Sequence, residues 1–96
     1  MIDTIYTISV INRTLNSRCI GYYFNFEDAK ESVLYNNYDM ADNGYYNYAV
    51  IEKIREGLYR EPSEKHYFEY TVGGMFKECD EPEILKDSFH SFGIGC

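Results

Sequence analysis

The sequence holds few residues with the chemistry of a catalytic nucleophile or base. Cysteine and histidine supply Cys19, Cys79, Cys96, His66 and His90. Nucleophilic catalysis needs a Cys or Ser beside a His that a third group orients, and none of the five stands in a local motif of that kind. His66 falls in a predicted strand, where a hydrogen-bonded or exposed histidine is the ordinary interpretation. We therefore predict that the protein is not an enzyme.

Metal-binding spacings are also missing from the sequence. A zinc site usually contains a closely spaced pair of Cys or His ligands, and here the two closest such residues are His90 and Cys96. A calcium loop places oxygen ligands at alternating positions, which Asp39, Asp42 and Asn43 do not. We expect no metal and no cofactor.

Acids and tyrosines are the most abundant groups with binding chemistry. The formal net charge is −7, and the chain holds eleven Tyr and no Trp. This charge argues against direct binding to nucleic acid or to an anionic membrane, and favours a partner with a basic surface. Tyrosine is enriched at interfaces because it offers a large contact area at low entropic cost. The predicted partner-binding residues are an acidic cluster and three tyrosines: Glu78, Asp80, Glu81, Glu83, Asp87, Tyr46, Tyr48 and Tyr67.

Two plainer interpretations of these residues stay open. The segment from Glu78 to Asp87 could be a solvated face that keeps the protein soluble. The frequent tyrosines could reflect an AT-rich coding sequence.

A strand that runs into a short helix is the clearest structural signal. Thr4–Ile11 alternates and is rich in β-branched residues, and Arg18–Phe24 returns after a polar connection, so the two predict an antiparallel hairpin. Asn25 is a good N-cap for a helix that ends near Asn36 or Asn37. The apolar stripe of that helix lies at i, i+3, i+7 and i+8: Phe26, Ala29, Val33 and Leu34.

The second half of the chain predicts further strands. Tyr45–Ile54 is apolar on both faces and indicates a central strand, while Lys65–Val72 and Met75–Cys79 flank the turn Gly73-Gly74. A single helical turn is expected after Pro82. The predicted fold is α+β, an antiparallel sheet of about five strands in the order β-β-α-β-β-β, with one amphipathic helix packed on one face. The open edges of such a sheet make a homodimer possible.

The length of 96 residues predicts one domain, spanning 1–96. No apolar run has transmembrane length and no signal peptide is recognised, so we expect no membrane association and a cytoplasmic protein. Three cysteines in such a chain indicate free thiols rather than a disulfide framework.

Two segments, RCIGYYFNFEDAKESVLYNNYD and NYAVIEKIREGLY, resemble a family of small uncharacterised proteins carried by phages and mobile elements of low-GC bacteria. The resemblance covers roughly Ile5 to Tyr59 and carries no catalytic residues with it. It implies a context in which small acidic proteins include inhibitors of host defence, among them anti-CRISPR proteins acting in the host cytoplasm.

The first functional hypothesis is therefore a stoichiometric inhibitor that binds a host defence protein, specifically a CRISPR effector nuclease, and occludes its basic nucleic-acid-binding surface. A second hypothesis is an oligomeric protein that sequesters a nucleotide, with tyrosines stacking on bases and Arg18, Lys53, Arg55 and Arg60 as candidates to meet phosphates. A third is a protein-interaction module of another kind.

Overall fold

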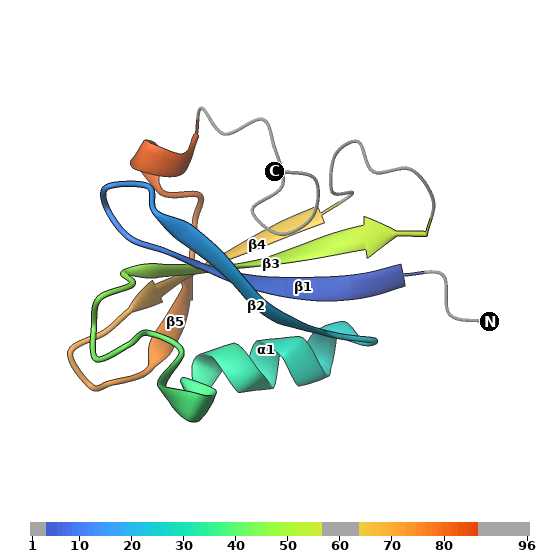
Figure 1. Ribbon diagram of the computed structural model, residues 1–96, viewed down its shortest axis with the longest axis horizontal. Coiled ribbons are helices and arrows are strands. Elements are labelled where there is room, and N and C mark those ends of the chain that lie inside the picture. Colours follow the sequence, from blue (N-terminus) through green and yellow to red (C-terminus); the bar gives the residue numbers. More distant parts are fainter. Residues whose placement is uncertain (1–3, 57–63, 87–96) are drawn as a thin grey trace.

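The structure is a computed structural model, and it describes residues 4–56 and 64–86 (Figure 1). Within these ranges the strands are β1 (Thr4–Ile11), β2 (Ser17–Tyr23), β3 (Tyr48–Arg55), β4 (Glu64–Tyr70) and β5 (Phe76–Cys79), and the helical elements are α1 (Phe26–Leu34) and two short 3-10 turns, η1 (Asn37–Asp39) and η2 (Glu83–Leu85). The strands form one antiparallel sheet in the order β2-β1-β3-β4-β5. The predicted small α+β fold is thereby confirmed.

The sheet is covered differently on its two faces. Figure 1 shows α1 lying under one face, with η2 on the opposite side of the sheet. We call these the helix face and the far face. The core of the helix face contains residues from four strands, from α1 and from the segment after η1: Ile8, Val10, Ala29, Val33, Met40, Ala41, Ala49, Ile51, Phe68 and Phe76. A smaller core on the far face contains Ile11, Val50, Tyr67 and Leu85.

The third strand is central, as its composition predicts. β3 has two neighbours on each side in the sheet. Ala49 and Ile51 belong to the core of the helix face, whereas Val50 belongs to that of the far face, and all three are fully buried. A strand covered on both faces reads as a continuous apolar run, which explains the dense signal in the sequence.

The start of α1 is fixed by its cap. Asn25 has an extended backbone, and its Oδ1 accepts the amide N–H of Asp28 at 2.8 Å. The Asn25 amide group also donates to the Asp28 carboxylate at 2.8 Å, so the two side chains bond to each other. Ala29 and Val33 on the predicted apolar stripe are fully buried against the sheet. The cap and the stripe together decide where the helix begins and which side faces the sheet.

Several element boundaries differ from the sequence prediction. β3 begins at Tyr48 rather than Tyr45, because the amide N–H groups of Tyr45 and Tyr46 bond to carbonyls of the preceding turn, those of Asp42 and Ala41. α1 ends at Leu34 rather than near Asn36. The reason is local, since Asn36 has a left-handed backbone with φ of 49° that cannot continue a right-handed helix.

Candidate functional site

The structure distributes the predicted partner-binding residues over both faces of the sheet. Tyr48 and Tyr67 pack in the far-face core, and Glu81 lies beside them. Glu78 lies on the helix face, where its carboxylate is 3.6 Å from the ammonium of Lys30 in α1. These side chains therefore do not form one continuous patch.

The other members of that set are also separated. Tyr46 packs at the margin of the helix-face core. Asp80 is exposed between β5 and η2, and the Glu83 carboxylate in η2 is 2.9 Å from the ammonium of Lys86. Asp87 lies outside the described residues. The contact role predicted for the acidic cluster stays a prediction.

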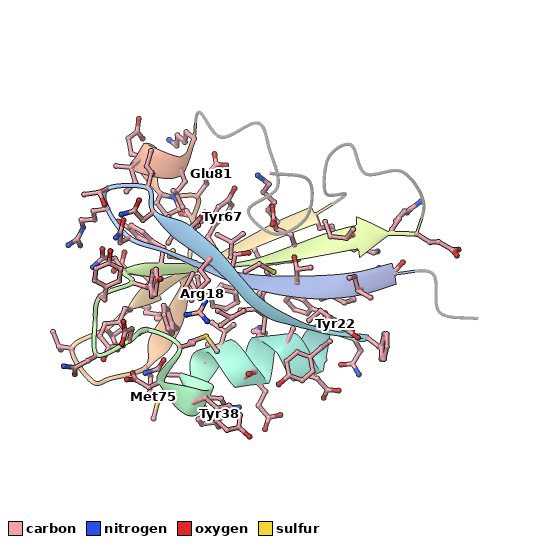
Figure 2. The ribbon with its side chains drawn as sticks, viewed as in Figure 1. Arg18, Tyr22, Tyr38, Tyr67, Met75 and Glu81 are labelled. Carbon is pink, nitrogen blue, oxygen red and sulfur yellow. The ribbon has the colours of Figure 1, made fainter. Side chains whose placement is uncertain are left out.

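Tyr67 is positioned as a structural residue. Its side chain is 8% exposed, and its hydroxyl donates to the Glu81 carboxylate at 2.8 Å (Figure 2). Burial raises the pKa of Tyr67 well above its usual value, and the hydrogen bond to Glu81 and the negative charges of Glu81 and Glu52 act in the same direction. The phenol therefore remains a neutral donor and holds the segment after β5 against the far face.

A cavity of about 580 Å³ lies between β2 and the segment that follows α1. Arg18 and Tyr23 line it from β2, Tyr38 and Asp42 line it from the opposite side, and Met40 and Ile8 contribute apolar surface. We name it the β2–η1 cavity. Its volume is within the range typical of small-molecule sites.

The register of β2 explains how its side chains reach this cavity. Arg18 pairs with Val10 and Tyr23 pairs with Tyr6, and both partners belong to the helix-face side of β1. Between these pairs the strand contains a β-bulge at Ile20, which changes the alternation of side chains along the edge. The bulge allows residues from both ends of β2 to share one face.

The Arg18 guanidinium is available to bind a ligand. Its side chain is exposed and, among the residues that the structure describes, has no hydrogen bond or ion pair. Figure 2 shows it in the centre of the view, with Tyr22 further along β2 and Tyr38 near the end of α1. An unpaired guanidinium next to aromatic rings is suited to bind a carboxylate or phosphate.

The loop opposite β2 has an unusual backbone. Five residues other than glycine have positive φ values of 49° to 56°: Asn36, Tyr38, Asp39, Asp42 and Asn43. Side chains within the loop support this path. Asn36 accepts the amide N–H of Ala41 at 3.0 Å and donates to the carbonyl of Gly74 at 3.1 Å, and Asp39 accepts the amide N–H of Asn43 at 3.1 Å. Asn and Asp tolerate the left-handed region well.

Among the five residues of this loop with positive φ, Tyr38 is the one that is neither Asn nor Asp. Its φ is 56° and its ψ is 25°, a conformation that costs an ordinary L-residue about 1–2 kcal/mol. Its side chain is fully exposed at the mouth of the cavity, so no burial of the ring offsets that cost. Strained residues that gain nothing within the fold are concentrated at functional sites.

The surface around the cavity is aromatic and acidic. Exposed aromatic and acidic side chains lie on β2, α1, η1 and their connections, and five of them line the cavity. We call the whole set the β2–α1–η1 face: Tyr22, Tyr23, Phe24, Glu27, Glu31, Tyr35, Tyr38, Asp39 and Asp42. Tyr22, Phe24 and Tyr35 are each more than half exposed. Residues 24–47 hold five acids and Lys30 as the one base. Such a surface combines large contact area with negative charge.

His66 and Cys79 occupy structural positions and Cys19 is exposed, whereas His90 and Cys96 lie outside the described residues. His66 stacks on Phe26 with 4.4 Å between ring centroids, and its Nε2 is 3.2 Å from the Glu64 carboxylate. Burial raises the pKa of the Cys79 thiol, which lowers its reactivity as a thiolate. Across residues 4–56 and 64–86, no group of three or more Cys, His, Asp or Glu is placed to hold a metal ion.

The cavity lies apart from the predicted acidic cluster, and of the predicted contact residues it is lined by Tyr46 alone. The run NNYDMADNG predicts turns, and the structure forms turns there. Two facts could not come from the sequence: that β2 is an edge strand, and that the turn lies beside it. Both are required to bring Arg18 and Tyr38 to one cavity.

In the described part of the chain, no helix is long and apolar enough to cross a membrane. Comparison of the sequence and structure with protein-family models, curated proteins and solved structures gives no match.

Proposed function

We propose that this protein is a stoichiometric inhibitor that binds a basic surface on a host defence protein through the β2–α1–η1 face. The observation that carries the proposal is Tyr38, a fully exposed ring that is held in a left-handed backbone and lines the cavity together with Asp39 and Asp42. The left-handed backbone of Tyr38 costs conformational free energy, and the ring is nevertheless exposed to solvent. A contact residue is the role that accounts for that cost.

The chemistry of the face fits a partner rich in Arg and Lys. Tyr22, Tyr35 and Tyr38 offer aromatic faces for cation–π contact, and Glu31, Asp39 and Asp42 belong to the same face and offer carboxylates. Aromatic anchors supply most of the binding energy at such interfaces, whereas charges supply orientation and association rate.

The resemblance to phage and mobile-element proteins supports a defence protein as the target. CRISPR effector nucleases hold nucleic acid in positively charged channels, which is the surface that an acidic, aromatic protein can occupy. We propose such a nuclease as the specific partner, with inhibition caused by occlusion of the channel.

The test is cleavage of target DNA by a panel of guide-loaded CRISPR effector nucleases at increasing amounts of this protein. Two charge-reversal variants separate the two acidic surfaces. The first changes Asp42 and Glu31 to Lys, on the β2–α1–η1 face, and leaves Asp39 in place because its carboxylate accepts the amide N–H of Asn43. The matched control changes Asp80 and Glu83 to Lys, in the C-terminal acidic cluster.

Inhibition that saturates at a fixed molar ratio, and that the first variant loses while the control retains it, supports the proposal. Loss only in the control would move the interface to the C-terminal cluster. Full inhibition by both variants would refute a mechanism based on acidic charge. The absence of inhibition across the panel would refute an effector nuclease as the target.

A further inference from the structure

The β2–η1 cavity has features that docking on a protein surface does not need. An exposed acidic and aromatic face would suffice for a basic partner, yet the cavity contains a guanidinium, that of Arg18. Arg18 is one of three basic residues in the stretch from Thr4 to Asn47 and the only one that lines the cavity. The Arg18 guanidinium offers a partner to an anionic group of a guest, in a cavity that Asp39 and Asp42 line as well.

The charged side chains that line the cavity are those of Arg18, Asp39 and Asp42, and they differ in whether they have a hydrogen-bond partner. The Asp39 carboxylate accepts the amide N–H of Asn43 at 3.1 Å and is therefore used by the loop. Among the described residues, neither the Arg18 guanidinium nor the Asp42 carboxylate has such a partner. The cavity thus presents one free cation and one free carboxylate to a guest.

Aromatic and apolar surface fills the space around these charges. Tyr23 on β2 and Tyr38 on η1 line the cavity from opposite sides, and Ile8 and Met40 are buried residues at its base. A flat ring can stack on a tyrosine, as bases do in single-stranded nucleic acid sites. The volume of about 580 Å³ accommodates a ring with a sugar and a phosphate.

We propose that the β2–η1 cavity binds a nucleoside monophosphate whose base carries an amino group. Arg18 binds the phosphate, the tyrosines contact the base, and Asp42 accepts a hydrogen bond from the amino group. The recognised chemistry is a flat aromatic ring joined to an anionic group, with a hydrogen-bond donor on the ring. This site shares Tyr23, Tyr38 and Asp42 with the β2–α1–η1 face, and it differs from the proposed docking on a basic partner in its use of Arg18.

Isothermal titration calorimetry of the full chain tests the site with AMP, GMP, CMP and UMP. Adenosine tests the need for the anion, ribose 5-phosphate tests the need for the ring, and 4-aminobenzoate tests whether an aromatic carboxylate serves equally well. Ligand concentrations reach about 1 mM, the weak end of specific recognition.

The expected result is saturable heat with the amino-bearing nucleotides and weaker binding of adenosine and ribose 5-phosphate. Arg18→Gln should weaken nucleotide binding about tenfold or more, because a charge-assisted contact is lost. Asp42→Asn should reduce the preference for AMP, GMP and CMP over UMP. Arg13→Gln, in the exposed turn before β2, is the matched control and should bind as the original protein does.

Three results would overturn the proposal: no heat with any nucleotide, unchanged binding in Arg18→Gln, or binding of ribose 5-phosphate as tight as that of the nucleotides. Tight binding of 4-aminobenzoate that also requires Arg18 would support the ring-plus-anion chemistry and assign the ligand to aromatic carboxylates. Arg18→Lys keeps the charge and, with circular dichroism of each variant, separates loss of the contact from loss of the fold.

Discussion

Replacement of Tyr38 by glycine should make the fold more stable. The left-handed backbone costs a tyrosine about 1–2 kcal/mol, and glycine adopts the same φ of 56° freely. Glycine loses more conformational freedom on folding, which costs roughly 0.5–1 kcal/mol. Because the ring is fully exposed, its removal sacrifices no buried apolar area. The net gain in the free energy of unfolding is up to about 1.5 kcal/mol, equivalent to a rise in Tm of up to roughly 12 °C for a domain of this size.

Urea denaturation followed by circular dichroism measures this gain, and two variants control it. Tyr38→Ala removes the ring but keeps a side chain in the left-handed region, so its stability should stay near that of the original protein. Tyr35→Gly changes a neighbouring exposed tyrosine whose φ is −93°, so no strain is released and stability should fall. A Tyr38→Gly variant less stable than the original would refute the idea that this backbone is strained, and would remove the main argument for a contact role.

Three further predictions concern the rest of the fold. Asn25→Ala should cost about 1 kcal/mol in urea denaturation and Asn25→Ser little, because only the first removes the N-cap acceptor; equal losses would contradict the capping role. The hydrogen bond from His66 lowers the pKa of the Glu64 carboxyl below its usual 4.5, so the folded state binds fewer protons than the unfolded state there. Its contribution to stability is present above pH 4.5 and lost as the pH falls through the lowered pKa. Glu64→Gln should flatten the stability profile in that acid range, and an unchanged profile would refute the coupling. Burial raises the pKa of Cys79 while Cys19 is exposed, so iodoacetamide at mildly alkaline pH should modify Cys19 first in peptide mass mapping; faster modification of Cys79 would show that its thiol is not shielded.

The local signals in the sequence were sufficient to predict which helices and strands form and that the sheet is antiparallel. Asn25 marked the helix start, and the apolar content of residues 45–54 marked a strand covered on both faces. Each of these signals depends on neighbours in sequence, through hydrogen bonds and side-chain periodicity. The strand start at Tyr48 was missed because turn hydrogen bonds of Tyr45 and Tyr46 override their strand propensity.

The candidate site could not be predicted in this way, because it depends on which elements lie side by side in the folded structure. The predicted contact set treated Glu78 and Tyr67 as parts of one surface because they are close in sequence or similar in type. In the sheet they lie on opposite faces, since Glu78 contacts Lys30 of α1 while Tyr67 packs on Leu85 of η2. Strand order and the five residues with positive φ between positions 36 and 43 decide which side chains share a surface, and neither can be predicted from composition or spacing.

The central claim is that the β2–α1–η1 face is the binding surface of an inhibitor. Hydrogen–deuterium exchange of the protein, alone and bound to the nuclease that it inhibits, tests this claim directly. We predict slower exchange on binding in residues 17–24 and 35–46, with little change in residues 79–86. Protection limited to residues 79–86, or spread evenly over the chain, would contradict the assignment of this face.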